Sequence, residues 1–188
     1  MGTTMSATYA YADPPYLGQG KRLYGNLHEQ ASDYDNETTH RDLVNRLVDE
    51  YPDGWAMSLS TPSLPTILPM CPAGVRICAW VKPFAVFKPN VNPAYTWEPV
   101  IVHGGRNKRD RTEPTVKDHL IESITMRKGL VGAKPLRFCY WVMDLLGYQP
   151  GDTIHDLFPG TGVMGIAIEI QSGIPRHDQT QFEWDNAR

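Results

Sequence analysis

The sequence has few residues of the kinds that hold metal clusters or disulfide frameworks. It contains 188 residues and only three cysteines, none of them in a Cys-x-x-Cys pair. Because disulfide frameworks and zinc ribbons need cysteines in matched pairs, this usage excludes both and favours a reducing compartment. The six histidines also lack the spacing of metal ligands, so we expect no metal site.

Long apolar segments are also missing. No apolar run approaches the roughly 20 residues that span a membrane, and the N-terminus lacks the basic start and apolar stretch of a signal peptide. The sequence therefore predicts a protein of the cytoplasm rather than a membrane or secreted protein. Hydrophobic residues make up 41% of the chain and charged residues 21%, which is enough apolar material for one globular domain at residues 1–188.

Charge is nearly balanced overall but is distributed unevenly. The formal net charge is -3, so the chain as a whole is not a basic nucleic-acid binder. Between Gly104 and Lys134, eight lysines and arginines stand against four aspartates and glutamates, and the rest of the chain carries a net charge of -7. We therefore expect a polyanion to bind this one segment of an otherwise acidic protein.

Sixteen prolines and sixteen glycines divide the chain into short elements. Apolar and β-prone runs predict strands at residues 8–12, 55–59, 75–81, 97–103 and 153–158. Apolar residues at helical spacing predict helices at residues 39–51, 62–68, 135–146 and 163–171. A long loop is expected at residues 17–37, and one helical turn at residues 116–124. Strands that alternate with helices predict an α/β fold with a mostly parallel sheet.

A tetrapeptide of Asp13, Pro14, Pro15 and Tyr16 follows the first predicted strand. Two consecutive prolines stiffen the backbone and end strand pairing. They aim one carboxylate and one backbone carbonyl at a fixed point, with an aromatic ring beside them. Two acceptors and a stacking ring suit an –NH2 group on a flat heterocycle. The alternative is an ordinary loop in which Asp13 acts like a helix N-cap.

A second segment, residues 156–162, leaves the last predicted strand and enters a helix. It reads Asp-Leu-Phe-Pro-Gly-Thr-Gly. Glycines at such a turn let the backbone approach a ligand closely and present helix N–H groups to it. The phosphate-binding pattern G-x-x-x-x-G-K-S/T is absent, and a tight turn without a ligand is the alternative.

These segments resemble the motifs of the amino-methylating DNA methyltransferases, which use S-adenosylmethionine to methylate N6 of adenine or N4 of cytosine. Residues 13–16 resemble their catalytic tetrapeptide, and residues 156–162 resemble their cofactor loop, D-x-F-x-G-S/T-G. Residues 80–82 resemble the family's W-x-K strand, residues 97–102 its H-E-x-I/V-x-V strand, and residues 132–135 the K-P segment that precedes the cofactor loop. The tetrapeptide comes first, which is the permuted order of the family's β class.

The resemblance implies a doubly wound, Rossmann-like methyltransferase fold with a shortened C-terminus and S-adenosylmethionine as the cofactor. It also implies that Asp13 and the Pro14 carbonyl accept hydrogen bonds from the exocyclic amine of a flipped-out base, while Tyr16 stacks on that base. The residues expected to contact the cofactor are Asp156, Phe158, Gly160, Thr161, Gly162, Lys134 and Pro135. Either Glu183 or Asp185 is expected to supply the acid that binds the cofactor ribose.

The basic segment at residues 104–132 occupies the place where such enzymes carry a target-recognition region. The resemblance therefore implies contacts with the phosphates of double-stranded DNA, which provide affinity without reading the base sequence. The residues expected to make these contacts are Lys21, Arg22, Arg106, Lys108, Arg109, Arg111, Lys117, Arg127 and Lys128. The alternative for all of them is a solvated surface.

The chain departs from the family pattern in two ways. Few residues follow the cofactor loop, and the recognition segment is short. An open sheet edge beside the cofactor strand would invite pairing with a second chain, so we expect a homodimer. A compact enzyme of this kind would suit a bacterium or a phage-infected cell.

The base that would be methylated is less well determined than the fold. By family analogy, Asp at position 13 favours adenine-N6 over cytosine-N4 methylation, although both amines need the same two acceptors. An RNA adenine methyltransferase is disfavoured, because that relative usually has Trp where Tyr16 stands. The alternatives are therefore a cytosine-N4 methyltransferase and a non-catalytic subunit of the same fold that binds DNA or cofactor.

Overall fold

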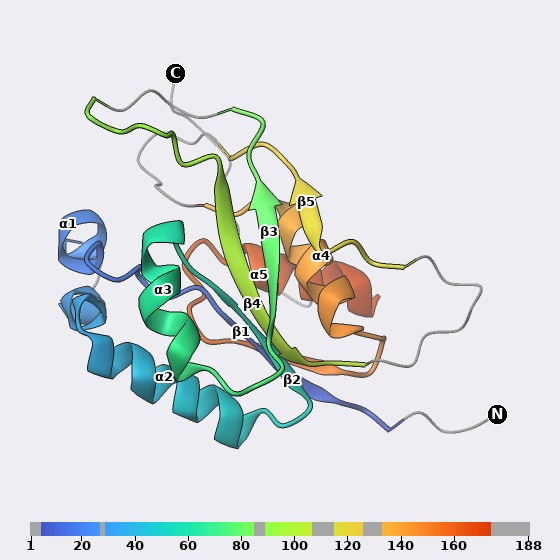
Figure 1. Ribbon diagram of the computed structural model, residues 1–188. Coiled ribbons are helices and arrows are strands. Elements are labelled where there is room, and N and C mark those ends of the chain that lie inside the picture. Colours follow the sequence, from blue (N-terminus) through green and yellow to red (C-terminus); the bar gives the residue numbers. More distant parts are fainter. Residues whose placement is uncertain (1–4, 27–28, 85–88, 107–114, 126–132, 174–188) are drawn as a thin grey trace.

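A six-stranded mixed sheet runs through the part of the protein that the computed structural model describes, residues 5–26, 29–84, 89–106, 115–125 and 133–173 (Figure 1). Its strands are β1 (Thr8–Ala12), β2 (Gly54–Ser58), β3 (Arg76–Val81), β4 (Trp97–Gly104), β5 (His119–Ile121) and β6 (Thr153–Asp156), in the spatial order β5-β3-β4-β2-β1-β6. Strand β1 is parallel to β2 and β6, β3 is parallel to β5, and β4 is antiparallel to both of its neighbours. All of these strands except β4 point the same way, which confirms the prediction of a mostly parallel sheet.

Helices cover both faces of this sheet. The helical elements are α1 (Gly20–Tyr24), η1 (Glu29–Asp35), α2 (Glu37–Glu50), η2 (Thr61–Ser63), α3 (Leu64–Ile67), η3 (Leu68–Met70), α4 (Leu136–Leu146) and α5 (Val163–Ser172). Helices α2 and α3 pack on one face, and α4 and α5 pack on the other (Figure 1). The protein thus has the three layers of a doubly wound α/β fold.

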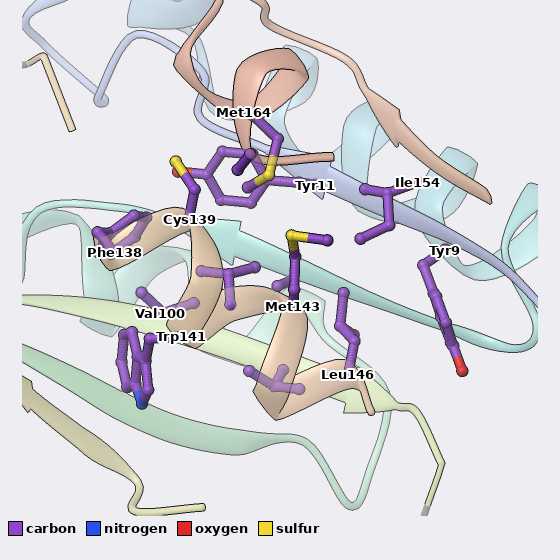
Figure 2. Close-up of a cluster of buried hydrophobic side chains, with 14 of the residues drawn as sticks. Tyr9, Tyr11, Val100, Phe138, Cys139, Trp141, Met143, Leu146, Ile154 and Met164 are labelled. Carbon is purple, nitrogen blue, oxygen red and sulfur yellow. The ribbon is translucent and has the colours of Figure 1, made fainter. Parts of the chain in front are cut away.

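Strand β1 shows how the sequence assigns side chains to the two faces. Tyr9 and Tyr11 belong to the core under α4 and α5, whereas Ala10 and Ala12 belong to the core under α2, because successive side chains of a strand alternate. All four are buried. The rings of Tyr11 and Phe138 of α4 meet edge to face with their centroids 6.2 Å apart (Figure 2). This contact anchors α4 above the strand that leads to the tetrapeptide.

Two segments differ from the sequence-based expectation. Residues 17–37, expected as a loop, contain α1 and η1, because the Asp35 carboxylate accepts hydrogen bonds from the backbone amides of Gly20 (2.7 Å) and Lys21 (3.0 Å). Residues 116–124, expected to include a helical turn, contain β5 instead. Pairing of β5 with β3 supplies the backbone hydrogen-bond partners that a lone helical turn would lack.

Helix boundaries follow from their caps. Helix α2 begins earlier than predicted, since the Asn36 side chain accepts a hydrogen bond from the amide of Thr38 (2.9 Å). Pro135 is the N-cap of α4 rather than part of its first turn. Gly147, with a φ of 68°, ends α4 in the left-handed conformation. Among the residues described, no helix is long and apolar enough to span a membrane.

One edge of the sheet collects the ends of several strands. The carboxyl ends of β1, β2, β3 and β6 lie there, because these strands run in the same direction. Strand β4 begins at this edge because it runs the opposite way. In α/β sheets, ligands bind beyond the carboxyl ends of the strands, so this edge is where a functional site is expected.

Candidate active site

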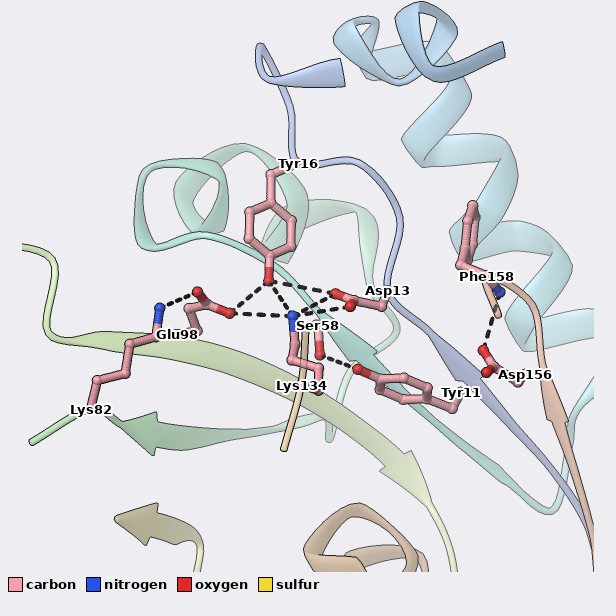
Figure 3. A network of polar contacts seen from close by, with 9 residues as sticks. All are labelled: Tyr11, Asp13, Tyr16, Ser58, Lys82, Glu98, Lys134, Asp156 and Phe158. Atoms are coloured by element: carbon pink, nitrogen blue, oxygen red, sulfur yellow. Dashed lines mark hydrogen bonds and ion pairs between the residues drawn. The ribbon is translucent and has the colours of Figure 1, made fainter. Parts of the chain in front are cut away.

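The Asp13-Pro14-Pro15-Tyr16 segment leaves β1 at this edge. Pro14 and Pro15 have no backbone N–H to continue the ladder, so the strand ends at Ala12. The Asp13 side chain points towards Lys134 and Tyr16 (Figure 3). Both carboxylate oxygens of Asp13 lie 3.0 Å from Lys134 Nζ. The tetrapeptide therefore presents a paired and only partly buried carboxylate rather than a helix cap.

The ammonium group of Lys134 lies at the centre of the site. The Lys134 side chain is only 6% exposed, and it directly precedes the N-cap residue of α4. It also donates a hydrogen bond to Tyr16 Oη (3.0 Å) and lies 3.4 Å from Glu98 Oε2. The ammonium thus contacts Asp13 and Tyr16, and the cofactor contact that the sequence predicts for Lys134 stays a prediction.

Glu98 and Lys82 complete the site, and sequence reasoning gave neither a role. The Tyr16 hydroxyl donates to Glu98 Oε2 (2.7 Å), and Lys82 forms an ion pair with Glu98 Oε1. Glu98 belongs to β4, and Lys82 directly follows β3. Both residues lie in the segments that resemble family motifs. The missing signal was the direction of β4, which brings the start of this strand to the carboxyl edge.

Burial and charge together determine the ionisation of this cluster. Burial opposes the charged form of Lys134, but Asp13 and Glu98 outweigh it and raise the pKa of the ammonium. Burial also opposes ionisation of Glu98, but Lys134 and Lys82 outweigh it and lower the pKa of that carboxyl. For Asp13, burial raises the pKa, Lys134 lowers it in part, and Glu98 raises it again, so the net shift is upward.

Aromatic rings surround the buried ammonium. Lys134 Nζ lies 5.4 Å from the ring centroid of Tyr16, 5.7 Å from that of Trp80 and 5.8 Å from that of Phe138. Ring faces attract cations at such distances. The pKa of Tyr16 is raised well above its ordinary value, by burial first and then by Glu98 and Asp13, so its hydroxyl keeps its proton and donates a hydrogen bond to Glu98.

The glycine loop meets the tetrapeptide at the same edge. Strand β6 pairs with β1 so that Asp156 is opposite Tyr11, which brings together two motifs that lie far apart in the chain. Gly160 (φ 48°) and Gly162 (φ 73°) adopt left-handed conformations that other residues rarely take. A Cβ atom at Gly162 would meet no atom of the described residues within 4 Å. Conformation therefore requires glycine there, and no described residue crowds this position.

The acidic and aromatic residues of this loop are held by neighbouring groups. The Asp156 carboxylate accepts a hydrogen bond from the amide of Phe158 (3.2 Å). Burial raises the pKa of Asp156 to about 6, and the nearby Asp13 charge adds to the rise. The ring of Phe158 packs edge to face against Tyr34 of η1, with centroids 5.3 Å apart. Thr161 is exposed at the tip of the loop.

Arg106, one of the predicted DNA contacts, forms an ion pair within the protein. Arg106 lies just beyond the C-terminal end of β4, at the edge opposite Asp13. Its guanidinium group binds both carboxylate oxygens of Asp152 and donates to the backbone oxygen of Met5 (2.9 Å). The Asp152 side chain is only 2% exposed. Arg106 therefore neutralises a buried carboxylate at the start of β6.

The other predicted basic and acidic residues are only partly described. Lys21 and Arg22 are exposed on α1, a few residues beyond Tyr16, and Lys117 is exposed just before β5. Several predicted residues lie outside the described part of the chain: Lys108, Arg109, Arg111, Arg127, Lys128, Glu183 and Asp185. In the part that is described, no three His, Cys, Asp or Glu side chains cluster so as to hold a metal ion.

Comparison with known proteins gives matches of structure but not of sequence. No protein-family profile and no curated protein matches the chain. The M1.HpyAVI–SAM complex superposes with a TM-score of 0.55 at 16% identity, over 89% of this chain and 79% of that one. TTHA0409 from Thermus thermophilus, described as a DNA modification methylase complexed with S-adenosyl-L-methionine, superposes with a TM-score of 0.54 at 16% identity, over 89% and 78%. The chain therefore has the Rossmann-like fold of these proteins, the methyltransferase fold expected from its motifs.

Proposed function

We propose that the protein is a DNA methyltransferase that uses S-adenosylmethionine to methylate the exocyclic N6 amine of adenine. One observation carries the proposal: the Asp13 carboxylate at the end of β1 lies next to the glycine loop at the end of β6. An amine acceptor and a ligand loop on one sheet edge are what direct transfer requires, because the two reactants must be held close together. Both similar proteins were solved with this cofactor.

The residues of the glycine loop fit such a cofactor. No described residue crowds Gly162, and the Asp156 carboxylate at the end of β6 offers hydrogen-bond acceptors. When bound, S-adenosylmethionine supplies a methyl group on a positively charged sulfur. The residues proposed to hold it are Asp156, Phe158, Gly160, Thr161 and Gly162.

The tetrapeptide is proposed to orient the amine. The Asp13 carboxylate and the Pro14 carbonyl accept its two hydrogens, which draws the nitrogen lone pair out of conjugation with the ring and directs it towards the cofactor side of the site. The stiff Pro14-Pro15 backbone holds both acceptors in place before the substrate arrives, so little reorganisation is needed during transfer. Tyr16 is proposed to lie against the flipped-out base.

Double-stranded DNA is the proposed substrate. Exposed Lys21 and Arg22 on α1 follow closely after the tetrapeptide, where they are proposed to bind the phosphates that flank the target base. Residues 104–132 are proposed as the target-recognition segment, because their net positive charge contrasts with the acidic remainder of the chain. We propose that this activity takes place in the cytoplasm of a bacterium or of a phage-infected cell.

A homodimer is also proposed. Strand β6 is the last strand on its side of the described sheet, and an unpaired strand edge favours association with a second copy. Light scattering should then give twice the mass of one chain. A mass equal to one chain would remove this part of the proposal without affecting methyl transfer.

Nucleoside analysis tests the activity directly. The protein is incubated with double-stranded DNA and isotope-labelled S-adenosylmethionine, and the digested nucleosides are identified by mass spectrometry. Labelled N6-methyladenine is the expected product. Asp13→Ala should abolish it while the Kd for the cofactor stays nearly unchanged. The control Asp49→Ala, which removes an exposed carboxylate of α2, should keep full activity.

Other outcomes of the nucleoside analysis would each indicate a different function. Labelled N4-methylcytosine would replace the adenine proposal with its cytosine counterpart on the same site. Cofactor binding without any labelled nucleoside would indicate a non-catalytic subunit. Full activity in Asp13→Ala would refute the role given to the tetrapeptide.

A further inference from the structure

Four side chains of alternating charge form a continuous series of contacts at the carboxyl edge: Lys82, Glu98, Lys134 and Asp13 (Figure 3). Lys82 pairs with Glu98. Lys134 lies 3.4 Å from Glu98 Oε2 and 3.0 Å from both oxygens of Asp13. The Lys134 ammonium is therefore shared between two carboxylates, and one of these, Glu98, is itself offset by Lys82.

The members of this series differ in their exposure to solvent. The Asp13 side chain is 22% exposed, whereas that of Lys134 is 6% exposed. A substrate can thus reach Asp13 from solvent, while Lys134 contacts it from the interior. A carboxylate has about four lone-pair positions. Lys134 donates a hydrogen bond to Oδ1 and lies 3.0 Å from Oδ2, so acceptor positions are left for an incoming amine.

Glu98 also determines where the Tyr16 proton goes. A phenol has one proton to donate. The Tyr16 hydroxyl lies 2.7 Å from Glu98 Oε2 but 3.5 Å from Asp13 Oδ1. The proton is therefore directed to Glu98 and does not take an acceptor position on Asp13.

We propose that Glu98 is a positioning residue for methyl transfer: by sharing the Lys134 ammonium with Asp13, it keeps the Asp13 carboxylate a strong hydrogen-bond acceptor for the substrate amine. This role rests on the proposed function. A carboxylate whose charge is neutralised by an ammonium of its own is a weaker base, and a weaker base is a weaker acceptor. Glu98 limits that neutralisation by holding part of the Lys134 charge.

Other titratable groups also face Asp13 and must be kept constant in any test. They come from four different elements: Tyr11 of β1, Tyr24 of α1, Cys139 of α4 and Asp156 of β6. Substitution at Glu98 or Lys82 leaves all four side chains in place. Glu98 contributes to the raised pKa of Tyr24, but a tyrosine with a raised pKa stays neutral in the pH range where carboxyl groups titrate. A change in the titration of Asp13 in such variants therefore reports on the series of charges and not on these neighbours.

Carboxyl-carbon NMR of the whole protein measures the titration of Asp13, with Asp13→Asn used to identify its signal. Glu98→Gln keeps the shape of the side chain but removes its negative charge. The Lys134 ammonium then interacts mainly with Asp13, so the titration midpoint of Asp13 should fall. Lys82→Met removes one of the two cations that contact Glu98, so Lys134 is drawn towards Glu98 and the titration midpoint of Asp13 should rise. The control Glu50→Gln, on an exposed residue of α2, should leave the midpoint unchanged.

Activity supplies a second measurement. Glu98→Gln should lower kcat roughly 10- to 100-fold, comparable to the loss of a partner that orients a metal ligand, with the Kd for S-adenosylmethionine unchanged. The positioning role of Glu98 would be overturned if the titration midpoint of Asp13 stayed fixed, or moved in the same direction in Glu98→Gln and Lys82→Met. An unchanged kcat in Glu98→Gln would overturn it too. If Glu98→Gln does not fold, the midpoint in Lys82→Met decides alone.

The two proposals can fail separately. If the midpoints move as expected but the wild-type protein transfers no methyl group, the proposed function fails together with the positioning role, while the charge sharing stands. If the wild-type protein methylates DNA but the midpoints do not move, the proposed function stands and the role of Glu98 is refuted.

Discussion

Replacing Lys134 by methionine removes the cation that lies between two carboxylates. In the wild type, its ammonium contacts Asp13, Glu98 and Tyr16 from a side chain that is 6% exposed. Methionine fills similar space but leaves only Lys82 to offset two negative charges. Loss of one member of a buried ion pair costs about 3–5 kcal/mol. We expect the free energy of unfolding at neutral to mildly alkaline pH to fall by about that amount.

This loss should depend on pH. In the wild type the pKa of Glu98 is lowered, because Lys134 and Lys82 outweigh the effect of burial. A depressed carboxyl pKa contributes stability above the unfolded pKa, and this stability is lost as the pH falls through the folded value. Lys134 lowers the pKa of both Asp13 and Glu98. Without it we expect both values to rise, so the folded variant should bind protons more readily than the folded wild type. The stability difference from wild type should therefore shrink as the pH falls.

Urea unfolding at about pH 8 and about pH 5 measures both effects, with two-state analysis of each transition. The control Lys21→Met, on an exposed residue of α1, should change stability by less than about 0.5 kcal/mol at either pH. A loss below about 1 kcal/mol in Lys134→Met at the higher pH, or a loss that is equal at both pH values, would refute the view that Lys134 stabilises two partly buried carboxylates.

Other substitutions test the core, the loop and the basic segment. Phe138→Ala, at a fully buried ring, should lower the free energy of unfolding by about 3–5 kcal/mol in urea melts. Arg106→Met should cost about 3–5 kcal/mol, because the buried Asp152 carboxylate loses its cation and keeps only the backbone amides of Ala7 and Gln149 as donors, and should leave the salt dependence of DNA binding unchanged. Gly162→Ala should cost about 1–2 kcal/mol for its left-handed backbone and weaken calorimetric binding of S-adenosylmethionine. Neutralising the basic residues at 108–111 should lower the slope of log affinity against log salt by about 0.9 for each DNA phosphate that the protein no longer neutralises.

Elements whose limits depend on their own residues could be predicted from the sequence. Strand β1 has the predicted bounds, since Pro14 and Pro15 stop it whatever its neighbours are. The turn at residues 160–162 was also predictable, because glycine is the residue that takes a left-handed conformation without strain. Both motifs of the candidate site lie in such segments, and this is why the site could be located before its geometry was known.

Elements that depend on a distant partner could not be predicted. Strand β5 is only three residues long and exists through pairing with β3. Helix α1 is five residues long and is held at its start by the Asp35 carboxylate. Neither has enough internal hydrogen bonds to be stable alone, so no local pattern distinguishes it from a loop.

By itself, the sequence determined the two loops, the Asp13 carboxylate and the alternation that buries Tyr9 and Tyr11, because proline, glycine and strand periodicity act within a few residues. The tertiary structure alone decided which charges meet. The antiparallel direction of β4 brings Glu98 to the carboxyl edge, where Lys134 links it to Asp13. The same direction carries Arg106 to the opposite edge, where it binds Asp152. Charges interact through space and not along the chain, so which pairs form is determined by strand direction and packing.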